Sequence, residues 1–268
     1  MPERVALITG AGRGIGRALA LELAARGCRV YGTFRTPPGK HPGFEPLIMD
    51  VTDHGSVDRA VASVIEKEGA IHILVNNAGI NVCGPLEEVS IEDARRAFET
   101  NYFGALKAIQ AVLPGMRERR SGVIANIGSA AGKITIPFQG HYSGSKYAME
   151  ALSEALWHEV RSLGVRVILF EPGDVGTSIW KTTPKPEAAQ SAYRPLLEKF
   201  YAVKDREMDA GRATPAPAAA RRMADIILSD TSALRHPVAH MAGLILFLRK
   251  ILPDAVFLNI VGKNYGAR

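Results

Sequence analysis

The sequence predicts an α/β fold: one doubly wound domain whose parallel sheet is covered by helices on both faces. Short apolar segments alternate with helical segments over the first two thirds of the chain, and a glycine-rich turn follows the first apolar segment. The chain has 268 residues, of which 47% are hydrophobic, and this is enough for one well-buried core. We therefore expect residues 1–268 to form a single domain.

Six segments have the continuous apolar character of strands that are buried on both faces, namely residues 5–8, 29–34, 47–49, 71–75, 123–127 and 165–170. Between them, apolar residues recur at helical spacing in residues 17–26, 57–67, 91–116 and 143–163. Strands that alternate with helices of this length indicate βαβ crossovers, and hence a parallel sheet.

The pattern becomes less regular after residue 170. Residues 178–212 combine prolines with several aromatic residues and show little periodicity, so we expect a mobile substrate lid that orders on ligand binding. Residues 216–228 are predicted to be helical, and a last strand is expected to begin at Val238. Residues 236–268 form a C-terminal extension, whose apolar part is expected either to cover the pocket or to contact a membrane peripherally. Its longest apolar tract, residues 244–248, is far too short to span a bilayer.

Charge and cysteine content narrow the class of protein. The formal net charge is +6, with Lys and Arg scattered along the chain. This favours an acidic small ligand such as a nucleotide over a nucleic acid, which would need a basic patch. Cys28 and Cys83 form neither a disulfide framework nor a metal-ligand pattern, so we expect no metal site and a reducing, cytoplasmic location.

The glycine-rich turn at residues 9–16, called the glycine turn below, joins the first strand to the first helix. Glycines let the backbone turn tightly and approach a phosphate, and the helix N-terminus adds N–H groups and a positive dipole. Ile15 stands where the common G-x-G-x-x-G pattern has its last glycine, and the spacing present is Gly10, Gly12, Gly14 and Gly16. A plain tight turn with close helix packing is the alternative interpretation.

Charge after the second strand bears on the choice of dinucleotide. An NAD site usually places an acidic residue about 20 residues after the glycines, where it holds the ribose 2′-hydroxyl. Residues 28–36 contain no Asp or Glu, and Arg35 stands at the end of the strand. Arg13 lies within the glycine turn, so two guanidinium groups are available for a 2′-phosphate. The sequence therefore predicts NADP as the cofactor, unless both arginines are merely solvated surface residues.

Tyr142 and Lys146 are four residues apart at the start of a predicted helix, which puts them on one helix face. A tyrosine phenol titrates near 10, and a neighbouring ammonium lowers that value by favouring the phenolate. The pair can therefore exchange a proton with an alcohol or a ketone. Taken alone, however, this spacing is common on surface helices.

Together the motifs resemble those of the short-chain dehydrogenase/reductase family. The matching residues occur in the family's order over roughly residues 4–178: Thr9, Gly10, Gly14, Ile15, Gly16, Asp50, Val51, Thr52, Asn76, Asn77, Ala78, Gly79, Asn101, Ser129, Tyr142, Lys146, Pro172, Gly173 and Thr177. The resemblance implies a Rossmann domain with about seven parallel strands.

The resemblance also implies a role for each matching residue. Tyr142 would exchange a proton with the substrate oxygen, Ser129 would hydrogen-bond that oxygen, and Lys146 would lower the pKa of Tyr142 and bind the nicotinamide ribose. Asn101 would hold a water that links Lys146 to solvent. The remaining cofactor contacts would come from the glycine turn, Arg13, Arg35, Asp50, Val51, Asn77, Ala78, Gly79, Val175 and Thr177.

The implied function is an NADP-dependent oxidoreductase that interconverts a ketone or aldehyde and an alcohol. Residues 142–150 and the turn at residues 171–174 resemble the hydroxysteroid- and retinol-dehydrogenase-like branch, which implies an apolar substrate, polycyclic or long-chain. A reductase of 3-oxoacyl thioesters or of a polyketide carbonyl is the enzymatic alternative, and an NADP-binding scaffold or sensor without turnover is the alternative from another class. The resemblance further implies a homodimer or homotetramer, paired through residues 91–116 and 143–163.

Overall fold

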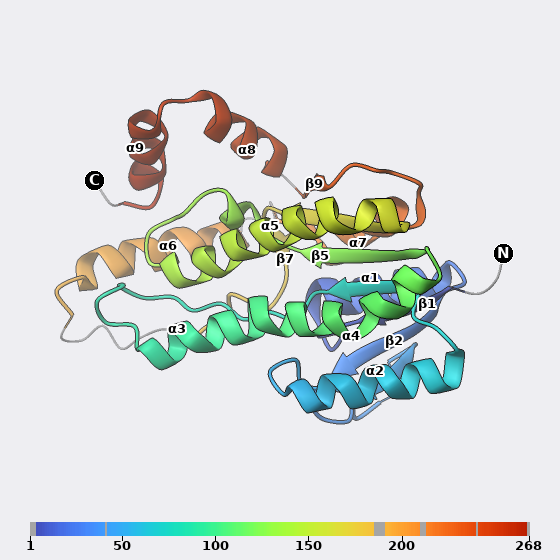
Figure 1. The fold of residues 1–268 in the computed structure, drawn as a ribbon. Coiled ribbons are helices and arrows are strands. Elements are labelled where there is room, and N and C mark those ends of the chain that lie inside the picture. The colour runs from blue at the N-terminus through green and yellow to red at the C-terminus, as the bar shows by residue number, and fades with distance from the viewer. Residues whose placement is uncertain (1–3, 41, 185–190, 210–212, 240, 267–268) are drawn as a thin grey trace.

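The computed structural model describes residues 4–40, 42–184, 191–209, 213–239 and 241–266. Their centre is a seven-stranded parallel sheet, which confirms the predicted fold class (Figure 1). Its spatial order is β3 (Glu45–Ile48), β2 (Arg29–Phe34), β1 (Val5–Ile8), β4 (Ile73–Asn76), β5 (Gly122–Ile127), β6 (Val165–Pro172) and β9 (Arg235–Val238). The chain reverses its direction of winding between β1 and β4, and ligands of such sheets bind at the carboxyl ends of the strands at that point.

Helices cover both faces of the sheet because alternate side chains of each strand point to opposite sides. Ala6 and Ile8 of β1 pack with α1 (Gly14–Ala25) and α7 (Ala216–Leu228). Val5 and Leu7 of the same strand pack with helices on the other face, which are α2 (His54–Glu68), α4 (Gly104–Glu118) and α5 (Gly140–Val160). The central strands β1 and β4 are thus buried on both sides, which explains their apolar sequence, whereas the edge strands β3 and β9 are only partly buried.

Local signals set the helix ends. The Asp53 side chain accepts a hydrogen bond from the backbone N–H of Ser56 and caps α2, and Gly69 ends that helix with φ of 78°. Ser90 caps α3 (Ile91–Phe98) in the same way. The predicted helical segment 91–116 is two helices, because one π-helical turn, Glu99–Phe103, lies between α3 and α4. Single π turns of this kind occur often at functional sites.

The lid is more regular than expected. A 16-residue helix, α6 (Arg194–Asp209), occupies the part of residues 178–212 that was predicted to show little periodicity, so that prediction is wrong there. Two short strands, β7 (Val175–Gly176) and β8 (Thr214–Pro215), flank this segment in the sequence and pair with each other. Residues 185–190 and 210–212 of the predicted lid lie outside the described residues.

The C-terminal extension consists of two further helices, α8 (Ala242–Ile251) and α9 (Asp254–Asn264), which stand above α5 and α6 in Figure 1. Over the described part of the chain, none of the helices combines the length and apolarity needed to cross a bilayer.

Candidate active site

The glycine turn lies at the carboxyl end of β1, beside the switch in strand order, and its backbone requires glycine. Gly10 and Gly14 have φ of 67° and 59°, in the left-handed region that side-chain-bearing residues avoid. A Cβ added to Gly16 would lie 2.3 Å from the Asn77 amide nitrogen and 2.5 Å from the Gly10 carbonyl oxygen. Glycine is therefore required by the turn's own backbone and by its packing on Asn77, and the turn leads directly into α1, whose N-terminus can bind a phosphate.

Two buried threonines hold this turn in place, Thr9 from the glycine-rich motif and Thr33, which no motif indicated. The Thr9 hydroxyl accepts hydrogen bonds from the backbone N–H groups of Asn77 and Ala78, each at 2.9 Å. The Thr33 hydroxyl accepts from the Gly10 N–H at 3.0 Å. The Asn77 side chain in turn donates to the carbonyl oxygens of Thr9 and Gly10. Asn77, expected along the adenine ribose, thus also ties the end of β4 to the glycine turn.

The two arginines predicted to select NADP are both exposed and both border this turn. Arg35 directly follows β2, and Arg13 is the residue before α1. The Arg13 guanidinium donates to the Thr182 hydroxyl at 3.1 Å, so it lies against the first residues of the lid. Neither arginine makes an ion pair with a carboxylate among the described residues, so neither positive charge is neutralised by a partner there.

The other predicted cofactor residues also lie at the carboxyl ends of the strands. Asp50 follows β3, and its Oδ1 accepts from the Thr52 N–H and hydroxyl at 2.9 and 2.8 Å. Val51 is buried against Gly104. Val175 is buried in β7, and the Thr177 side chain lies next to Gly14. Ala78 and Gly79 continue from β4, and the Cα of Ala78 is close to Gly10.

A space of about 570 Å³ opens beside these residues, between α1 and the segment after β7. Gly14 and Thr177 are among its lining residues, together with two cations, Arg17 and Lys181. The glycine turn and the exposed cations Arg13 and Arg35 beside it fit a phosphorylated ligand, although neither arginine lines this space. Within the described residues, no group of three or more His, Cys, Asp or Glu side chains is placed to hold a metal ion.

The predicted catalytic residues lie close together where the carboxyl end of β5 meets the start of α5. Ser129 follows β5, and its hydroxyl hydrogen-bonds the Tyr142 phenol. One turn further along α5, the buried Lys146 places its ammonium 5.9 Å from the centre of the Tyr142 ring. The ammonium donates to the Ile127 carbonyl oxygen at 2.8 Å, which fixes it at the end of β5. Ser129, Tyr142 and Lys146 therefore lie close together at the carboxyl end of β5, and their catalytic roles stay a prediction.

Asn101 reaches the same place from the π-helical turn. Its side-chain amide donates to the Ile80 carbonyl oxygen and to the Ser145 hydroxyl, and its oxygen accepts from the Ile80 N–H at 2.8 Å. Ser145 lies between Tyr142 and Lys146 in the sequence and donates to the Tyr142 carbonyl oxygen. Asn101 thus fixes the start of α5 and the chain after β4, and the role expected of it in a water relay stays a prediction.

Burial controls the protonation of the catalytic pair in the ligand-free protein. It raises the pKa of the Tyr142 phenol, and the hydrogen bond with Ser129 acts in the opposite direction, so the lowered pKa expected from the neighbouring Lys146 is not found in the ligand-free protein. Burial lowers the pKa of Lys146 to about 8. The phenol is therefore a proton donor at neutral pH, and Lys146 is close enough to neutrality for small changes around it to alter its charge.

A buried acidic pair, Glu150 and Glu171, lies one helical turn beyond Lys146, and no sequence motif indicated it. Burial, and then the charge of Glu150, raise the pKa of Glu171 to about 7. Lys133 lies 3.4 Å from the Glu150 carboxylate, and Arg235 lies 3.0 Å from it. The four residues come from α5, β6, β9 and the loop after β5, so only the folded topology brings them together.

Aromatic side chains pack the lid against the chain that precedes Tyr142. Trp180 and Phe200 are buried together with Cys83, and their ring centres are 5.9 Å apart. Phe138, four residues before Tyr142, packs on Phe200 with centres 5.4 Å apart. Because Trp180 also donates to the Asp205 carboxylate at 2.8 Å, it packs the lid from within. An apolar cluster therefore holds the lid to the chain around Cys83 and Phe138.

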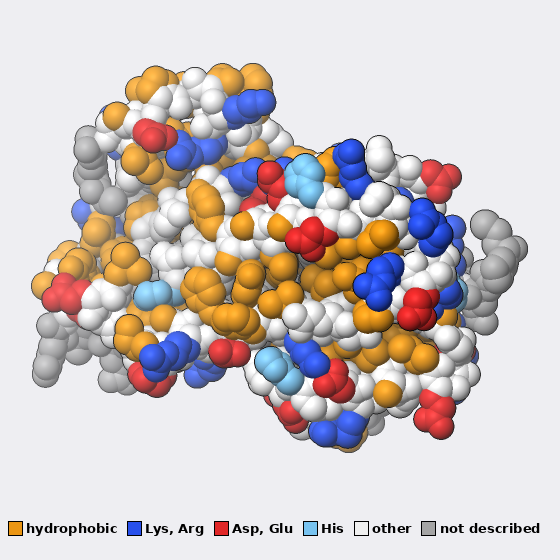
Figure 2. Space-filling model, viewed as in Figure 1, with side chains coloured by type: hydrophobic (Ala, Val, Ile, Leu, Met, Phe, Trp, Pro, Cys, Tyr) orange, Lys and Arg blue, Asp and Glu red, His pale blue; other side chains and the backbone are white. Residues whose placement is uncertain are grey.

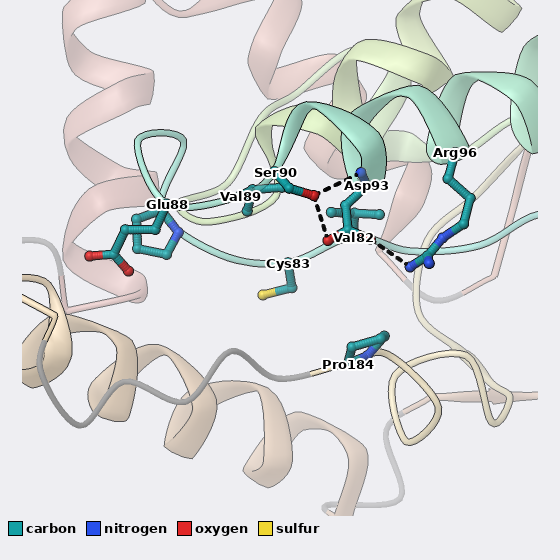
Figure 3. A pocket seen from close by; sticks show the side chains of 9 residues that line it. Val82, Cys83, Glu88, Val89, Ser90, Asp93, Arg96 and Pro184 are labelled. Carbon is teal, nitrogen blue, oxygen red and sulfur yellow. Dashed lines mark hydrogen bonds and ion pairs between the residues drawn. The ribbon is translucent and has the colours of Figure 1, made fainter.

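A smaller pocket of about 210 Å³ lies between the chain after β4, the start of α3 and Pro184 (Figure 3). The Ser90 hydroxyl and the Arg96 guanidinium both bind Asp93 on one side of it. Cys83 connects this pocket to the aromatic cluster of the lid. None of Ser129, Tyr142 and Lys146 lines it, so we do not assign the reacting part of the substrate to it.

Comparisons with known proteins agree with this geometry. A family model described as short chain dehydrogenase matches residues 4–188. A 3-ketodihydrosphingosine reductase of Bacteroides thetaiotaomicron is 42% identical over 177 residues, which is 66% of this chain and 66% of that protein. An NADPH-dependent 3-dehydrocapnine reductase of Ornithobacterium rhinotracheale is 38% identical over 66% of this chain and 67% of its own length.

Two solved structures extend the similarity to nearly the whole chain. A short-chain dehydrogenase from Streptomyces avermitilis has a TM-score of 0.81 and 29% identity, with 100% of this chain and 98% of that chain covered. A short chain dehydrogenase from Burkholderia cenocepacia in complex with NADP has a TM-score of 0.75 and 27% identity, over 96% and 97% of the two chains. The chain belongs to the short-chain dehydrogenase family and is an oxidoreductase of that family.

Proposed function

We propose that the protein is an NADP-dependent reductase of a ketone or aldehyde, with Tyr142 as the acid and base. The observation that carries this proposal is the buried group of Ser129, Tyr142 and Lys146, placed at the strand ends that also carry the glycine turn. NADPH would supply the hydride to the carbonyl carbon. The reverse reaction would oxidise the corresponding alcohol.

The three side chains account for the movement of the proton. The Tyr142 phenol donates its proton to the carbonyl oxygen as negative charge develops there, and the Ser129 hydroxyl stabilises the same oxygen by a hydrogen bond. The phenolate left behind is stabilised by the Lys146 ammonium, 5.9 Å from the ring centre. Burial of Tyr142 raises its pKa and keeps it protonated before the reaction, which suits the reductive direction.

Cofactor choice follows from charge at the glycine turn. Arg13 and Arg35 are exposed cations beside it, and no acidic residue stands at the end of β2 to bind a ribose 2′-hydroxyl. A guanidinium can bind a 2′-phosphate through two parallel hydrogen bonds. NADPH dependence in the name of the 3-dehydrocapnine reductase supports the same choice.

The apolar packing of the lid is compatible with an apolar substrate, because Phe138, Trp180 and Phe200 pack against one another where the lid meets the chain before Tyr142. The names of the two curated relatives, a 3-ketodihydrosphingosine reductase and a 3-dehydrocapnine reductase, mention no thioester and so favour a ketone without a thioester group. We therefore propose a long-chain or polycyclic ketone and its alcohol as the substrate pair.

NADPH oxidation measured with a panel of ketones, aldehydes and 3-oxoacyl thioesters tests this function. We expect kcat/KM to rise with the apolar length of the ketone. We also expect NADPH to be preferred over NADH by about 10- to 1000-fold, as two charged hydrogen bonds imply. A preference for thioesters would favour the polyketide or 3-oxoacyl alternative, and the absence of single-turnover oxidation with every carbonyl would favour a non-catalytic scaffold.

A further inference from the structure

The helices α8 and α9, called the C-terminal hairpin here, expose an unusual amount of apolar surface. Seven of the fourteen large hydrophobic side chains that are exposed in the described residues fall between Met241 and Ile260. Six of them belong to the hairpin itself and are between 45% and 57% exposed: Leu244, Phe247, Ile251, Val256, Leu258 and Ile260. Large contiguous apolar patches on a protein surface mark sites of interaction.

The distribution of these side chains around the helices indicates what covers them. On α8, Leu244, Phe247 and Ile251 follow the spacing of a single helical stripe. On α9, Val256 and Leu258 are two residues apart, which places them about 200° apart around the helix axis, and both are exposed. Helices in the headgroup boundary bury their apolar side chains among the lipid tails, and fluid lipid adapts to apolar side chains that do not form one flat face.

The charge of the hairpin complements an anionic surface. Residues 242–264 contain three basic residues, Arg249, Lys250 and Lys263, and a single acidic one, Asp254. Arg249 pairs with Asp254, and it also stacks over the buried ring of Phe257 at 5.3 Å, so it holds the two helices together. Figure 2 shows hydrophobic side chains along the outer edge of the hairpin and Lys and Arg side chains among them. Anionic lipid headgroups attract cations placed in this way.

The hairpin is joined to both sides of the candidate active site. At one end, Ala242 is buried and α8 contacts the short helix Ala130–Gly132, which directly follows Ser129. At the other end, Tyr265 packs on Phe200 of α6 with ring centres 5.5 Å apart. A surface that binds the hairpin would therefore lie beside the space between Ser129 and the lid.

We propose that the C-terminal hairpin docks on an anionic phospholipid bilayer, lies in its headgroup boundary and holds the active site at the lipid surface. The second part rests on the proposed function, since an apolar ketone would then pass from the bilayer into the site. The docking itself requires only the apolar and basic residues of the hairpin.

Flotation of the full chain with vesicles tests the docking. We expect the protein to float with vesicles of phosphatidylcholine and phosphatidylglycerol at 7:3, and at least tenfold less with pure phosphatidylcholine or in high salt. Phe247→Gln with Leu258→Gln should reduce flotation at least tenfold, whereas the matched pair Ile48→Gln with Ile65→Gln, on exposed apolar residues of β3 and α2, should leave it unchanged. Thermal unfolding of all variants checks that they fold.

Oligomeric state and activity complete the test. If the wild type does not float, or if both double variants lose flotation equally, the bilayer proposal is wrong. If the hairpin variant instead converts a dimer to a monomer in light scattering and vesicles have no effect, the surface is occupied by a second copy of this chain. With NADPH, the hairpin variant should keep its rate on a short water-soluble ketone and lose at least tenfold on a long-chain ketone dissolved in vesicles. Flotation without any turnover would sustain the docking and contradict the proposed function.

Discussion

At the scale of single residues, the protonation of Lys146 is the feature most open to measurement. Its pKa is lowered by burial to about 8 in the folded protein and returns to about 10.5 on unfolding. Between these values the unfolded state binds more protons, so burial of this residue costs stability below pH 8, and the cost disappears as the pH rises through 10.5. Lys146 is thus kept at the expense of stability, as functional residues often are.

Lys146→Met should therefore stabilise the ligand-free protein while abolishing turnover. At pH 7 we expect the free energy of unfolding to rise by about 2 kcal/mol, which is the cost of the lowered pKa less the lost hydrogen bond to Ile127. Denaturant unfolding of both proteins from pH 7 to pH 10.5 measures it. A variant that is less stable at pH 7, or a difference that does not shrink toward pH 10.5, would contradict the burial of a charged Lys146.

Arg35 should decide the choice between the two dinucleotides. Arg35→Asp replaces a cation that can bind the 2′-phosphate by an acceptor for a 2′-hydroxyl, so it should lower kcat/KM for NADPH and raise it for NADH. We expect the ratio of the two values to fall by about 10- to 1000-fold. Arg161→Asp, in the turn before β6 at the amino ends of the strands, makes the same change of charge and should leave the ratio unaltered. Equal ratios in the two variants would remove Arg35 from cofactor selection.

At the scale of elements, the lid helix α6 should govern the substrate rather than the cofactor. Phe200→Ala removes the ring on which Phe138, Trp180 and Tyr265 pack, and such truncations cost about 3–5 kcal/mol of local packing. We expect hydrogen exchange in α6 to accelerate and KM for the apolar ketone to rise about tenfold, with the Kd of NADPH unchanged. Glu198→Ala, on the exposed side of α6, is the matched control. An unchanged KM would contradict a role for the lid in substrate binding.

Elements whose apolar residues pack on the sheet were predictable from the sequence, whereas the lid helix, which packs elsewhere, was not. The strands β1 and β2 and the helix α7 begin and end where the sequence predicts, because their apolar residues pack directly on the sheet. The helix α6 was missed because Trp180 and Phe200 are buried against each other and against Phe138, not on the sheet. The aromatic residues of the lid indicated that this region is apolar, but they did not predict the helix.

At the scale of the whole molecule, the topology brings together residues that no local pattern relates. Tyr142 and Lys146 could be recognised as a pair because they lie one helical turn apart, and Ser129 joins them through the resemblance to a family. Glu150 and Glu171 meet only because α5 packs on β6, and their opposing cations come from elsewhere again. A sequence shows such a cluster only after the order of the strands is known.

The central claim is that Tyr142 transfers the proton while NADPH supplies the hydride. Its most direct test is a single-turnover measurement of NADPH oxidation by the best ketone of the panel, in the wild type and in Tyr142→Phe, with the Kd of NADPH determined for both. General acid catalysis is worth about 10²–10⁴ in rate, so we expect the variant to lose at least a hundredfold in rate with its Kd unchanged. A Phe variant that keeps more than about a tenth of the wild-type rate would contradict the assignment of Tyr142 as the acid.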